Sequence, residues 1–234
     1  MNDVTGFYDE FVDYQLSYLT TPNPRLRRVR EQLLPLIEER EPQSALDVGC
    51  GIGLIAGWLA ERVPRVVGVD LSPRAVETAK KLQPELEFHV CAPPGDPLPA
   101  GRFDLITLID VVEHFPRKEL SALFERVEAA AADDAVVAVN VPSRLFALSR
   151  RSDQDQIIDE ALGVDEVVSA AAAIEMEPLV VTRYGCESSN QYAFCAFSRT
   201  YDVATPLKRT LRRRLQDRAW TTRERLGRGS RAPR

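Results

Sequence analysis

The sequence has little cysteine and no long apolar run. Its four cysteines, Cys50, Cys91, Cys186 and Cys195, contain no CxxC pair, and a chain of this length needs no disulfide to hold its core, so we expect reduced thiols. No stretch approaches the roughly 18 consecutive apolar residues that cross a bilayer, and the start, MNDVTGFYDEFVDY, is unlike a signal peptide. These absences predict a cytoplasmic protein.

The composition is not that of a fibrous or disordered chain. Hydrophobic residues make up 44% and charged residues 28% of the 234 residues, which is typical of a soluble protein with one sizeable domain. The net charge of −5 is unevenly distributed, because residues 202–234 hold 11 basic and 3 acidic residues and the preceding 201 hold 19 and 32. The acidic main part would repel phosphates, so no nucleic-acid partner is expected for it.

Between Ser44 and Ser198, short runs of β-branched residues alternate with segments of helical period. This alternation predicts an α/β fold with a mostly parallel sheet between helices. Ser72 followed by Pro73 is a typical helix start, because serine caps free amides and proline suits the first turn. The expected strands are Ala45–Val48, Val66–Asp70, Glu87–Val90, Phe103–Ile109, Ala135–Val141, Leu179–Tyr184 and Tyr192–Phe197. The expected helices are Leu54–Arg62, Pro73–Lys81, Lys118–Ala131 and Asp165–Ile174.

The last two expected strands are joined by only Gly185–Gln191. This connection has no room for a helical crossover, so the two strands should form an antiparallel hairpin at one side of the sheet. The predicted fold is therefore a seven-stranded, mostly parallel sheet with helices on both faces and a final antiparallel strand.

Segments outside the alternation predict a cap, a lid and a tail. Phe7–Leu36 mixes aromatic residues with an Arg-rich helical stretch that Pro22 and Pro24 interrupt. Ser143–Gly163 is longer than a usual connection and suggests a binding loop. After Pro206, leucines recur every four residues among arginines before GRGSRAPR. The expected divisions are a helical cap over 1–40, a core over 41–201 with a lid over 143–163, and a basic amphipathic, partly disordered tail over 202–234.

The strongest motif is Ala45-Leu-Asp-Val-Gly-Cys-Gly-Ile-Gly53, an apolar run that ends in three glycines before a helix. Glycine allows a sharp turn and close contact between backbone and ligand. Asp70 ends the next expected strand, where an acidic side chain can accept hydrogen bonds from both hydroxyls of a ribose. The two strand ends together predict a nucleoside site.

A dinucleotide site is the competing interpretation, because Gly51-Ile-Gly53-Leu-Ile-Ala56 also satisfies a loose GxGxxA pattern. Asp47, two residues before the first glycine, separates the two hypotheses. A carboxylate there would repel a diphosphate, whereas it tolerates a cationic ligand.

These residues resemble the (D/E)xGxGxG motif of the class I, Rossmann-like S-adenosylmethionine-dependent methyltransferases. GVDLSPRAVETAKKL and FDLITLIDVVEHF also fit, so the resemblance spans about 44–198. It implies S-adenosylmethionine as the cofactor, with the glycine loop against its methionine part and Asp70 on its ribose. Cys91-Ala92-Pro93-Pro94 departs from the acidic-then-small pattern usual near the adenine, which leaves the partner of the adenine amine open. The expected cofactor-binding residues are Asp47, Gly49, Cys50, Gly51, Gly53, Asp70, Leu71, Ala92, Ile109 and Asp110.

His114, just beyond the fourth expected strand, is the candidate catalytic base. Methyl transfer from a sulfonium is an in-line displacement that depends on positioning, and a base that titrates near neutrality assists a hydroxyl acceptor. His114 should lie on the same sheet edge as the glycine loop. The alternative is that it only orders the start of a helix. The other histidine, His89, lies inside an expected strand and is interpreted as structural.

Asp110, Glu113 and His114 stand at i, i+3 and i+4, so a helical turn would gather them on one face. They resemble the metal-binding patch of ubiquinone-pathway O-methyltransferases and of small-RNA 3′-end ribose methyltransferases. The RNA enzymes carry a further histidine that this chain lacks. Mg²⁺ or Mn²⁺ would suit these ligands, but related metal-free enzymes share Glu-His, and no metal is expected.

Further polar residues fall on the expected ligand edge. Asn140 closes the fifth strand and either orients an acceptor or forms a turn beside Pro142. Tyr8, Phe11, Tyr14 and Tyr18 in the cap recur at helical spacing, which is typical of a packed face or an aromatic pocket. The expected substrate contacts are Tyr14, Asn140, Arg144, Glu187 and Asn190.

The resemblance implies an enzyme that methylates a small molecule, and its style is that of bacterial small-molecule and sugar O-methyltransferases. The expected acceptor is a hydroxyl of a sugar, a polysaccharide precursor or a natural product. Three alternatives stay open: an N-methyltransferase, an RNA-modifying enzyme that uses the basic tail, and an S-adenosylmethionine-binding protein without catalysis. The tail either contacts an anionic membrane or protein partner, or forms a solvated extension.

Overall fold

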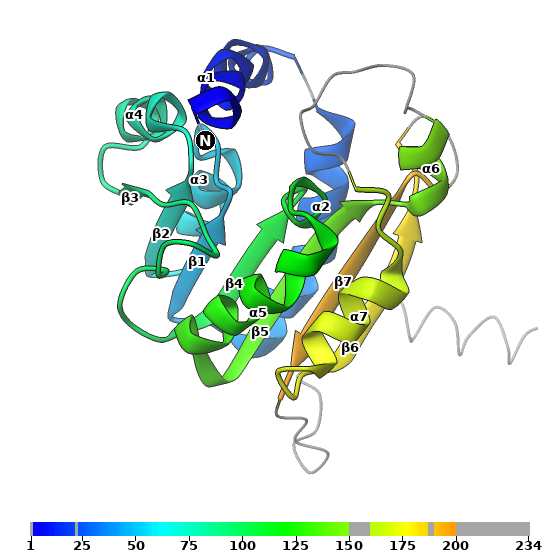
Figure 1. Cartoon of the computed structure of the whole chain (residues 1–234). Helices are drawn as coiled ribbons and strands as arrows, with labels where there is room; N and C mark the ends of the chain where they lie inside the picture. Colours follow the sequence, from blue (N-terminus) through cyan, green and yellow to red (C-terminus); the bar gives the residue numbers. More distant parts are fainter. Residues whose placement is uncertain (1, 22, 150–159, 187–189, 200–234) are drawn as a thin grey trace, which may run out of the picture.

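The computed structural model describes residues 2–21, 23–149, 160–186 and 190–199. Its centre is a seven-stranded sheet of order β3-β2-β1-β4-β5-β7-β6 (Figure 1). The neighbouring pairs from β3 to β5 are parallel, and β7 runs antiparallel to both β5 and β6. The strands are β1 Ser44–Val48, β2 Arg65–Asp70, β3 Glu87–Val90, β4 Phe103–Ile109, β5 Ala131–Pro142, β6 Glu177–Tyr184 and β7 Tyr192–Ser198. The predicted fold class and hairpin are confirmed.

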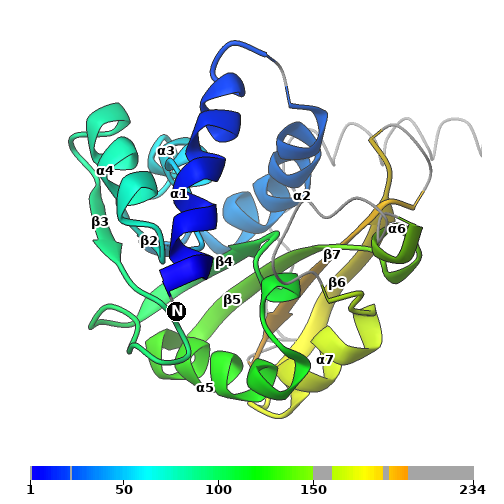
Figure 2. The same ribbon diagram turned by 45° about the horizontal axis from the view of Figure 1, so that its top comes forward.

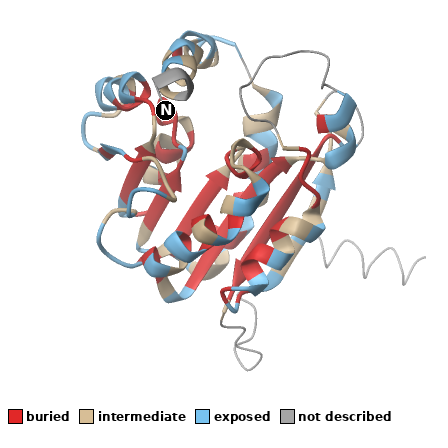
Figure 3. Ribbon diagram, in the orientation of Figure 1, coloured by how far each residue is buried: buried red, intermediate tan, exposed pale blue. Residues whose placement is uncertain are grey.

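Helices cover both faces of the sheet. The packed helices are α2 Pro24–Arg40, α3 Leu54–Ala60, α4 Pro73–Leu82, α5 Leu120–Ala130 and α7 Val164–Ala172. Side chains of α5 and α7 join one hydrophobic core with the strands, and side chains of α2, α3 and α4 join a second one. Figure 3 shows the buried strands between the two helical layers.

Helix starts follow from local chemistry. The Ser72 hydroxyl accepts a hydrogen bond from the Ala75 amide at 3.0 Å, and Pro73 occupies the first turn of α4, as the sequence predicts. Asn23 caps α2 in the same manner, with its side-chain oxygen on the amides of Arg25 and Leu26. These caps fix where α2 and α4 begin at the edge of the sheet.

The cap forms two helices, α1 Asn2–Ser17 and α2. Helix α2 packs on a sheet face through Val29, Leu33 and Ile37. Helix α1 instead lies across the carboxyl edge of the strands, near α4 (Figure 2). The cap helices therefore border the edge at which the predicted site lies.

Three local differences from the sequence interpretation have physical causes. Strand β5 begins at Ala131, four residues earlier than predicted, because the alanine-rich run leaves α5 directly into the sheet. A short helix, α6 Arg144–Ser149, stands in the segment predicted as a loop. Two single turns, η1 Val112–His114 and η2 Arg117–Glu119, precede α5, where the sequence predicted one helix from Lys118.

The rest of the predicted lid, residues 150–159, and the predicted basic tail lie outside the described residues. All four cysteines are described, and none of them forms a disulfide. Among the described helices, none is long and apolar enough to cross a bilayer.

Candidate functional site

The carboxyl ends of β1, β2 and β4 bring the predicted cofactor residues together. Strand β1 pairs with β2 on one side and β4 on the other, with Val48 opposite both Val69 and Leu108. The segments that follow these strands, which begin at Gly49, Asp70 and Asp110, therefore meet at one edge. This is the edge at which open α/β sheets bind ligands.

Positive φ angles shape the glycine loop. Gly49, Gly51 and Gly53 have φ of 70°, 53° and 83°, a backbone region that residues with a Cβ rarely adopt. A Cβ on Gly49 would overlap Val111, and one on Gly51 would meet the Gln15 side chain. The loop thus depends on glycine for its turn and for the close approach of neighbouring atoms.

Asp70 braces this loop. Its Oδ2 accepts a hydrogen bond from the Gly51 amide at 2.8 Å, and its Oδ1 accepts one from the Ser72 amide at 2.9 Å. Burial raises the pKa of Asp70, and the amide hydrogen bonds oppose that rise. A carboxylate has about four acceptor sites, so these two bonds leave capacity for ribose hydroxyls.

Asp47 is a buried acid near the carboxyl end of strand β1. Its side chain is almost fully buried, and its Oδ1 accepts a hydrogen bond from Thr107 Oγ1 at 2.7 Å. Its Oδ2 has no well-aligned hydrogen-bond partner. Burial raises the pKa of Asp47 to about 7, against the hydrogen bonds from Thr107 and the Ala56 amide. Such an oxygen is suited to a cation and unsuited to a phosphate.

A cavity of about 140 Å³ opens beside Asp47. Its walls come from the glycine loop, the segment after β4, helices α1 and α2, and the start of β7. Six of the predicted site residues line it: Asp47, Gly49, Cys50, Ile109, Asp110 and His114. The remaining predicted cofactor residues, Gly51, Gly53, Asp70, Leu71 and Ala92, lie outside its lining.

Helix α1 covers the loop next to this cavity. Gln15 fills the space above Gly51, and Val12 packs in a small apolar cluster with Ile52 of the loop. Phe11 and Tyr18 line the cavity. The predicted contact Tyr14 is 54% exposed and lies outside the lining, where its ring packs on those of Phe11 and Tyr18.

His114 lies in the turn after β4 and lines the cavity. Its side chain is 16% exposed, and its Nε2 lies 4.0 Å from Oε1 of the buried Glu113. Its ring meets the Tyr8 ring edge-on, with centroids 5.8 Å apart. The imidazole is therefore held between the cap and the sheet edge with access to the cavity.

Asp110 is the centre of a polar network that joins four elements. Its φ is 56°, its Oδ1 accepts a hydrogen bond from Asn140 Nδ2 at 2.7 Å, and its Oδ2 pairs with Arg25 Nε at 3.2 Å. Asn140 Oδ1 in turn accepts a hydrogen bond from the Tyr184 hydroxyl at 2.7 Å. Asn140 is fully buried, so in this structure it orients Asp110 from behind.

The same network includes Asp110 of the Asp110, Glu113 and His114 group that resembles a metal-binding patch. Both Asp110 oxygens have protein partners, and Glu113 and His114 occupy a tight 3₁₀ turn. Among the residues that the structure describes, no three His, Cys, Asp or Glu side chains are placed to hold a metal ion.

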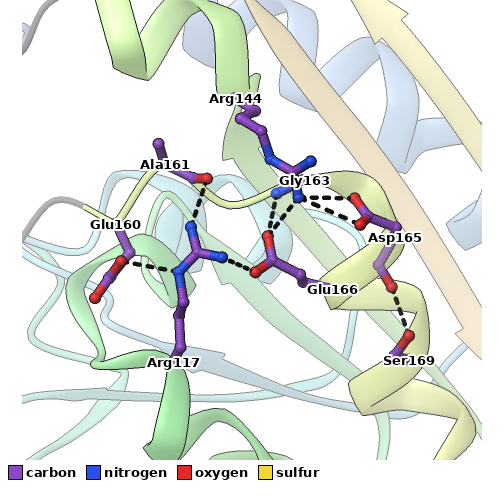
Figure 4. A network of polar contacts seen from close by, with 8 residues as sticks. All are labelled: Arg117, Arg144, Glu160, Ala161, Gly163, Asp165, Glu166 and Ser169. Atoms are coloured by element: carbon purple, nitrogen blue, oxygen red, sulfur yellow. Dashed lines mark hydrogen bonds and ion pairs between the residues drawn. The ribbon is translucent and has the colours of Figure 1, made fainter.

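Arg144 and Asn190, two of the other predicted contacts, are not among the residues that line the cavity. Arg144 pairs with Asp165 and Glu166 at the start of α7, as Figure 4 shows. The Asn190 carbonyl accepts a hydrogen bond from Ser143 Oγ at 2.7 Å, which places Asn190 beside the residue that follows β5. Glu187 lies outside the described residues. His89 is 47% exposed on the edge strand and pairs with Glu87.

Arg25 and Tyr192 are among the cavity residues that the sequence did not single out. Arg25 lies in the first turn of α2, and its guanidinium lies over the Tyr192 ring, 5.8 Å from the centroid. The available signal was the unfavourable position of a cation at a helix N-terminus, which calls for an acidic partner. The sequence could not name Asp110 as that partner.

Comparison with known proteins supports the fold and the motifs. Residues 17–170 match the family model of the methyltransferase domain. The chain is 32% identical over 125 residues to a chloroplastic tocopherol O-methyltransferase of Arabidopsis thaliana, over 48% of this chain and 36% of that one. It is 38% identical over 92 residues to a mitochondrial ubiquinone biosynthesis O-methyltransferase of Schizosaccharomyces pombe, over 36% and 33%. The chain thus spans about a third of the curated relatives it matches.

Among solved structures, the fold is similar to that of the N-methyltransferase NodS from Bradyrhizobium japonicum WM9 in complex with S-adenosyl-L-homocysteine. The TM-score is 0.66 at 17% identity, over 82% of this chain and 97% of that one. This likeness concerns the fold.

Proposed function

Because residues 17–170 match its model, the chain belongs to the methyltransferase domain family, and we propose that it is an enzyme that transfers a methyl group from S-adenosylmethionine to a small-molecule acceptor. The observation that carries the proposal is the pair of acids, the buried Asp47 and the half-buried Asp70, on adjacent strand ends around a glycine loop. The cofactor would supply a methyl group already activated on a cationic sulfur.

The residues present fit such a cofactor. Asp47 offers an oxygen without a well-aligned partner to a positive group, and Asp70 offers its remaining acceptor sites to a ribose. Gly49 lines the cavity and has no side chain to keep a ligand away from its backbone. A dinucleotide fits less well, because its diphosphate would meet the Asp47 carboxylate at the loop.

The acceptor would enter the cavity between His114 and the cap. His114 would receive the proton of an acceptor hydroxyl as the new bond forms, and the Tyr8 ring would hold the imidazole in place. We propose a hydroxyl of a sugar, a polysaccharide precursor or a natural product as the acceptor. The free thiols are consistent with a cytoplasmic location, which is part of the proposal.

Calorimetry with the full chain tests cofactor binding. S-adenosylmethionine should bind, and NAD should not. Asp70→Ala should weaken binding at least tenfold, because the ribose loses its acceptor. His114→Ala, the matched control, should retain wild-type affinity while methyl transfer in a screen with radiolabelled donor falls about 100-fold or more.

Absence of S-adenosylmethionine binding would refute the proposal. Binding without turnover on any acceptor would favour the alternative of a non-catalytic S-adenosylmethionine-binding protein. Unchanged turnover in His114→Ala would remove the proposed base and leave the cofactor site intact.

A further inference from the structure

Arg25 is a cation on the acceptor side of the cavity that the methyl-transfer chemistry does not use. It lies in the first turn of α2, lines the cavity and is 28% exposed. The helix dipole disfavours a positive charge at this end. The ion pair with Asp110 compensates for it and is the main reason why the pKa of Arg25 is raised.

The Arg25 guanidinium has donor capacity beyond this pair. Arginine carries five N–H donors, which suit two carboxylates at once. Arg117 and Arg144 each bind two carboxylates in this chain (Figure 4). Among the described residues, Asp110 is the one carboxylate paired with Arg25, at Nε, and Tyr192 takes a further hydrogen bond from the Arg25 side chain, so that part of the five-donor set remains. Arg25 thus has room for a second anion.

Different parts of the cavity wall suit different kinds of ligand. Asp47 and the glycine loop form the side that suits a cationic sulfur ligand. The lining also includes Arg25 and the aromatic side chains of Phe11, Tyr18 and Tyr192, and the Arg25 guanidinium lies 5.8 Å from the centroid of the Tyr192 ring. Aromatic side chains favour a flat apolar body, and a guanidinium beside them favours an acid group on it.

We propose that Arg25 binds an acid group of the acceptor, a carboxylate or a phosphate ester, and so selects flat hydroxylated acids as substrates. This inference rests on the proposed function, because it takes the cavity as the acceptor site. It assigns Arg25 a specificity role and leaves the transfer step to the groups around His114.

Small aromatic probes test this role without knowledge of the acceptor. Benzoate, phenyl phosphate and benzyl alcohol would be titrated by calorimetry into wild-type protein, both alone and saturated with S-adenosyl-L-homocysteine. At least one acid should bind about tenfold or more tightly than the alcohol, since a charge-assisted bidentate contact replaces a neutral one. The stronger acid identifies carboxylate or phosphate as the recognised group.

Variants then locate the preference. Arg25→Gln combined with Asp110→Asn removes both charges together, so that no buried carboxylate is left unpaired, and should abolish the preference for the acid. Arg25→Lys should retain part of it, because the charge stays and the fork is lost. Arg28→Gln, on the same helix but paired with Glu31 at the surface, should behave as wild type.

Two results would overturn the inference. One is wild-type protein that binds neither acid better than the alcohol. The other is a preference that survives in the Arg25→Gln, Asp110→Asn protein while its thermal unfolding stays cooperative. Failure of the proposed function is distinguishable, since it would appear as absent S-adenosyl-L-homocysteine binding, whereas the acid preference is also measured in the ligand-free protein.

Discussion

At the scale of single residues, the site holds one buried acid, Asp47, and one half-buried acid, Asp70. Asp47 and Asp70 both have raised pKa values, chiefly through burial. The charge of Asp70 adds to the rise at Asp47, and the charge of Asp9 adds to the rise at Asp70. A cation that binds beside Asp47 lowers the pKa of that carboxyl. Proton release should therefore accompany the binding of a sulfonium ligand.

This coupling predicts how cofactor affinity depends on pH. Asp47, with its pKa raised to about 7, binds a proton below that pH and must lose it when a cation binds. Affinity for S-adenosylmethionine should fall as pH drops below about 7, by up to about tenfold per unit, and level off above it. Calorimetry between pH 5.5 and 8.5, a range chosen to bracket roughly this pKa, would measure the profile.

Variants test whether Asp47 is the group responsible for this pH dependence. Asp47→Asn should flatten it and remove its share of the affinity above neutrality, whereas Asp70 would still contribute to any residual slope. Thr107→Val, which removes a hydrogen bond that lowers the Asp47 pKa, should move the midpoint to higher pH. A profile identical in wild type and Asp47→Asn would contradict the assignment.

The same shift affects stability with the opposite trend. Because folding raises the Asp47 pKa above its ordinary value, the folded state holds this proton more tightly than the unfolded state. Its contribution to stability is present at low pH and is lost as pH rises through about 7. Above neutrality a bound cation stabilises the ionised Asp47 carboxylate instead.

At the scale of elements, helix α1 is fastened to α4 rather than to the sheet. Asp9 Oδ1 accepts hydrogen bonds from the Ser72 hydroxyl and, at 3.2 Å, from the Arg74 amide. Arg74 also donates to the Asp9 carbonyl at 2.7 Å and pairs with Asp13 at 2.6 Å. The negative Asp9 stands at the positive end of α4, which stabilises the contact.

Because α1 is attached through α4 and not through the sheet, we expect it to act as a movable cover over the glycine loop. The cavity of about 140 Å³ is smaller than the roughly 300 Å³ at the lower end of ligand pockets, so α1 should shift when ligand binds. Asp9→Ala should raise amide hydrogen exchange in α1 about tenfold, since it removes a helix-end contact, and leave the interior of α4 unchanged.

Asp13→Ala is the matched control for that experiment. Asp13 is 70% exposed and loses one surface pair with Arg74, so exchange in α1 should change much less. Equal effects of the two variants would show that Asp9 does not fasten the helix. Faster association of S-adenosylmethionine with Asp9→Ala than with wild type would connect the fastening to access.

At the scale of the whole molecule, periodic patterns predicted the architecture well. The strands beginning at Glu87 and Phe103 match their predicted bounds, because apolar runs between turn residues mark buried strands. The short helix α6 was missed, since six residues carry too little period to distinguish them from a loop. The meeting of the glycine loop with Asp70 and Asp110 at one edge of the sheet was also predicted, because glycines and acids directly follow strands.

The part of the cavity wall around Arg25 was much less predictable. The Arg25–Asp110 pair joins residues 85 positions apart, and the contact of Tyr184 with Asn140 crosses the sheet through β7. Such pairs depend on which helix face meets which strand end, and the local periodic pattern of the sequence does not specify that. The pattern placed Asn140 at the correct edge, but whether its amide points to ligand or protein is a tertiary property.

The two faces of the sheet form separate cores that share β7. Phe194 is fully buried in the core of α2, α3 and α4, and Phe197 is fully buried in the core of α5 and α7. Each Phe→Leu change should reduce the free energy of unfolding by about 1 kcal/mol, through lost contacts and imperfect repacking. Because the side chains lie on opposite faces without shared core neighbours, the double variant should lose the sum to within about 0.5 kcal/mol. Urea unfolding would measure this, and a larger coupling would show that the faces do not pack independently.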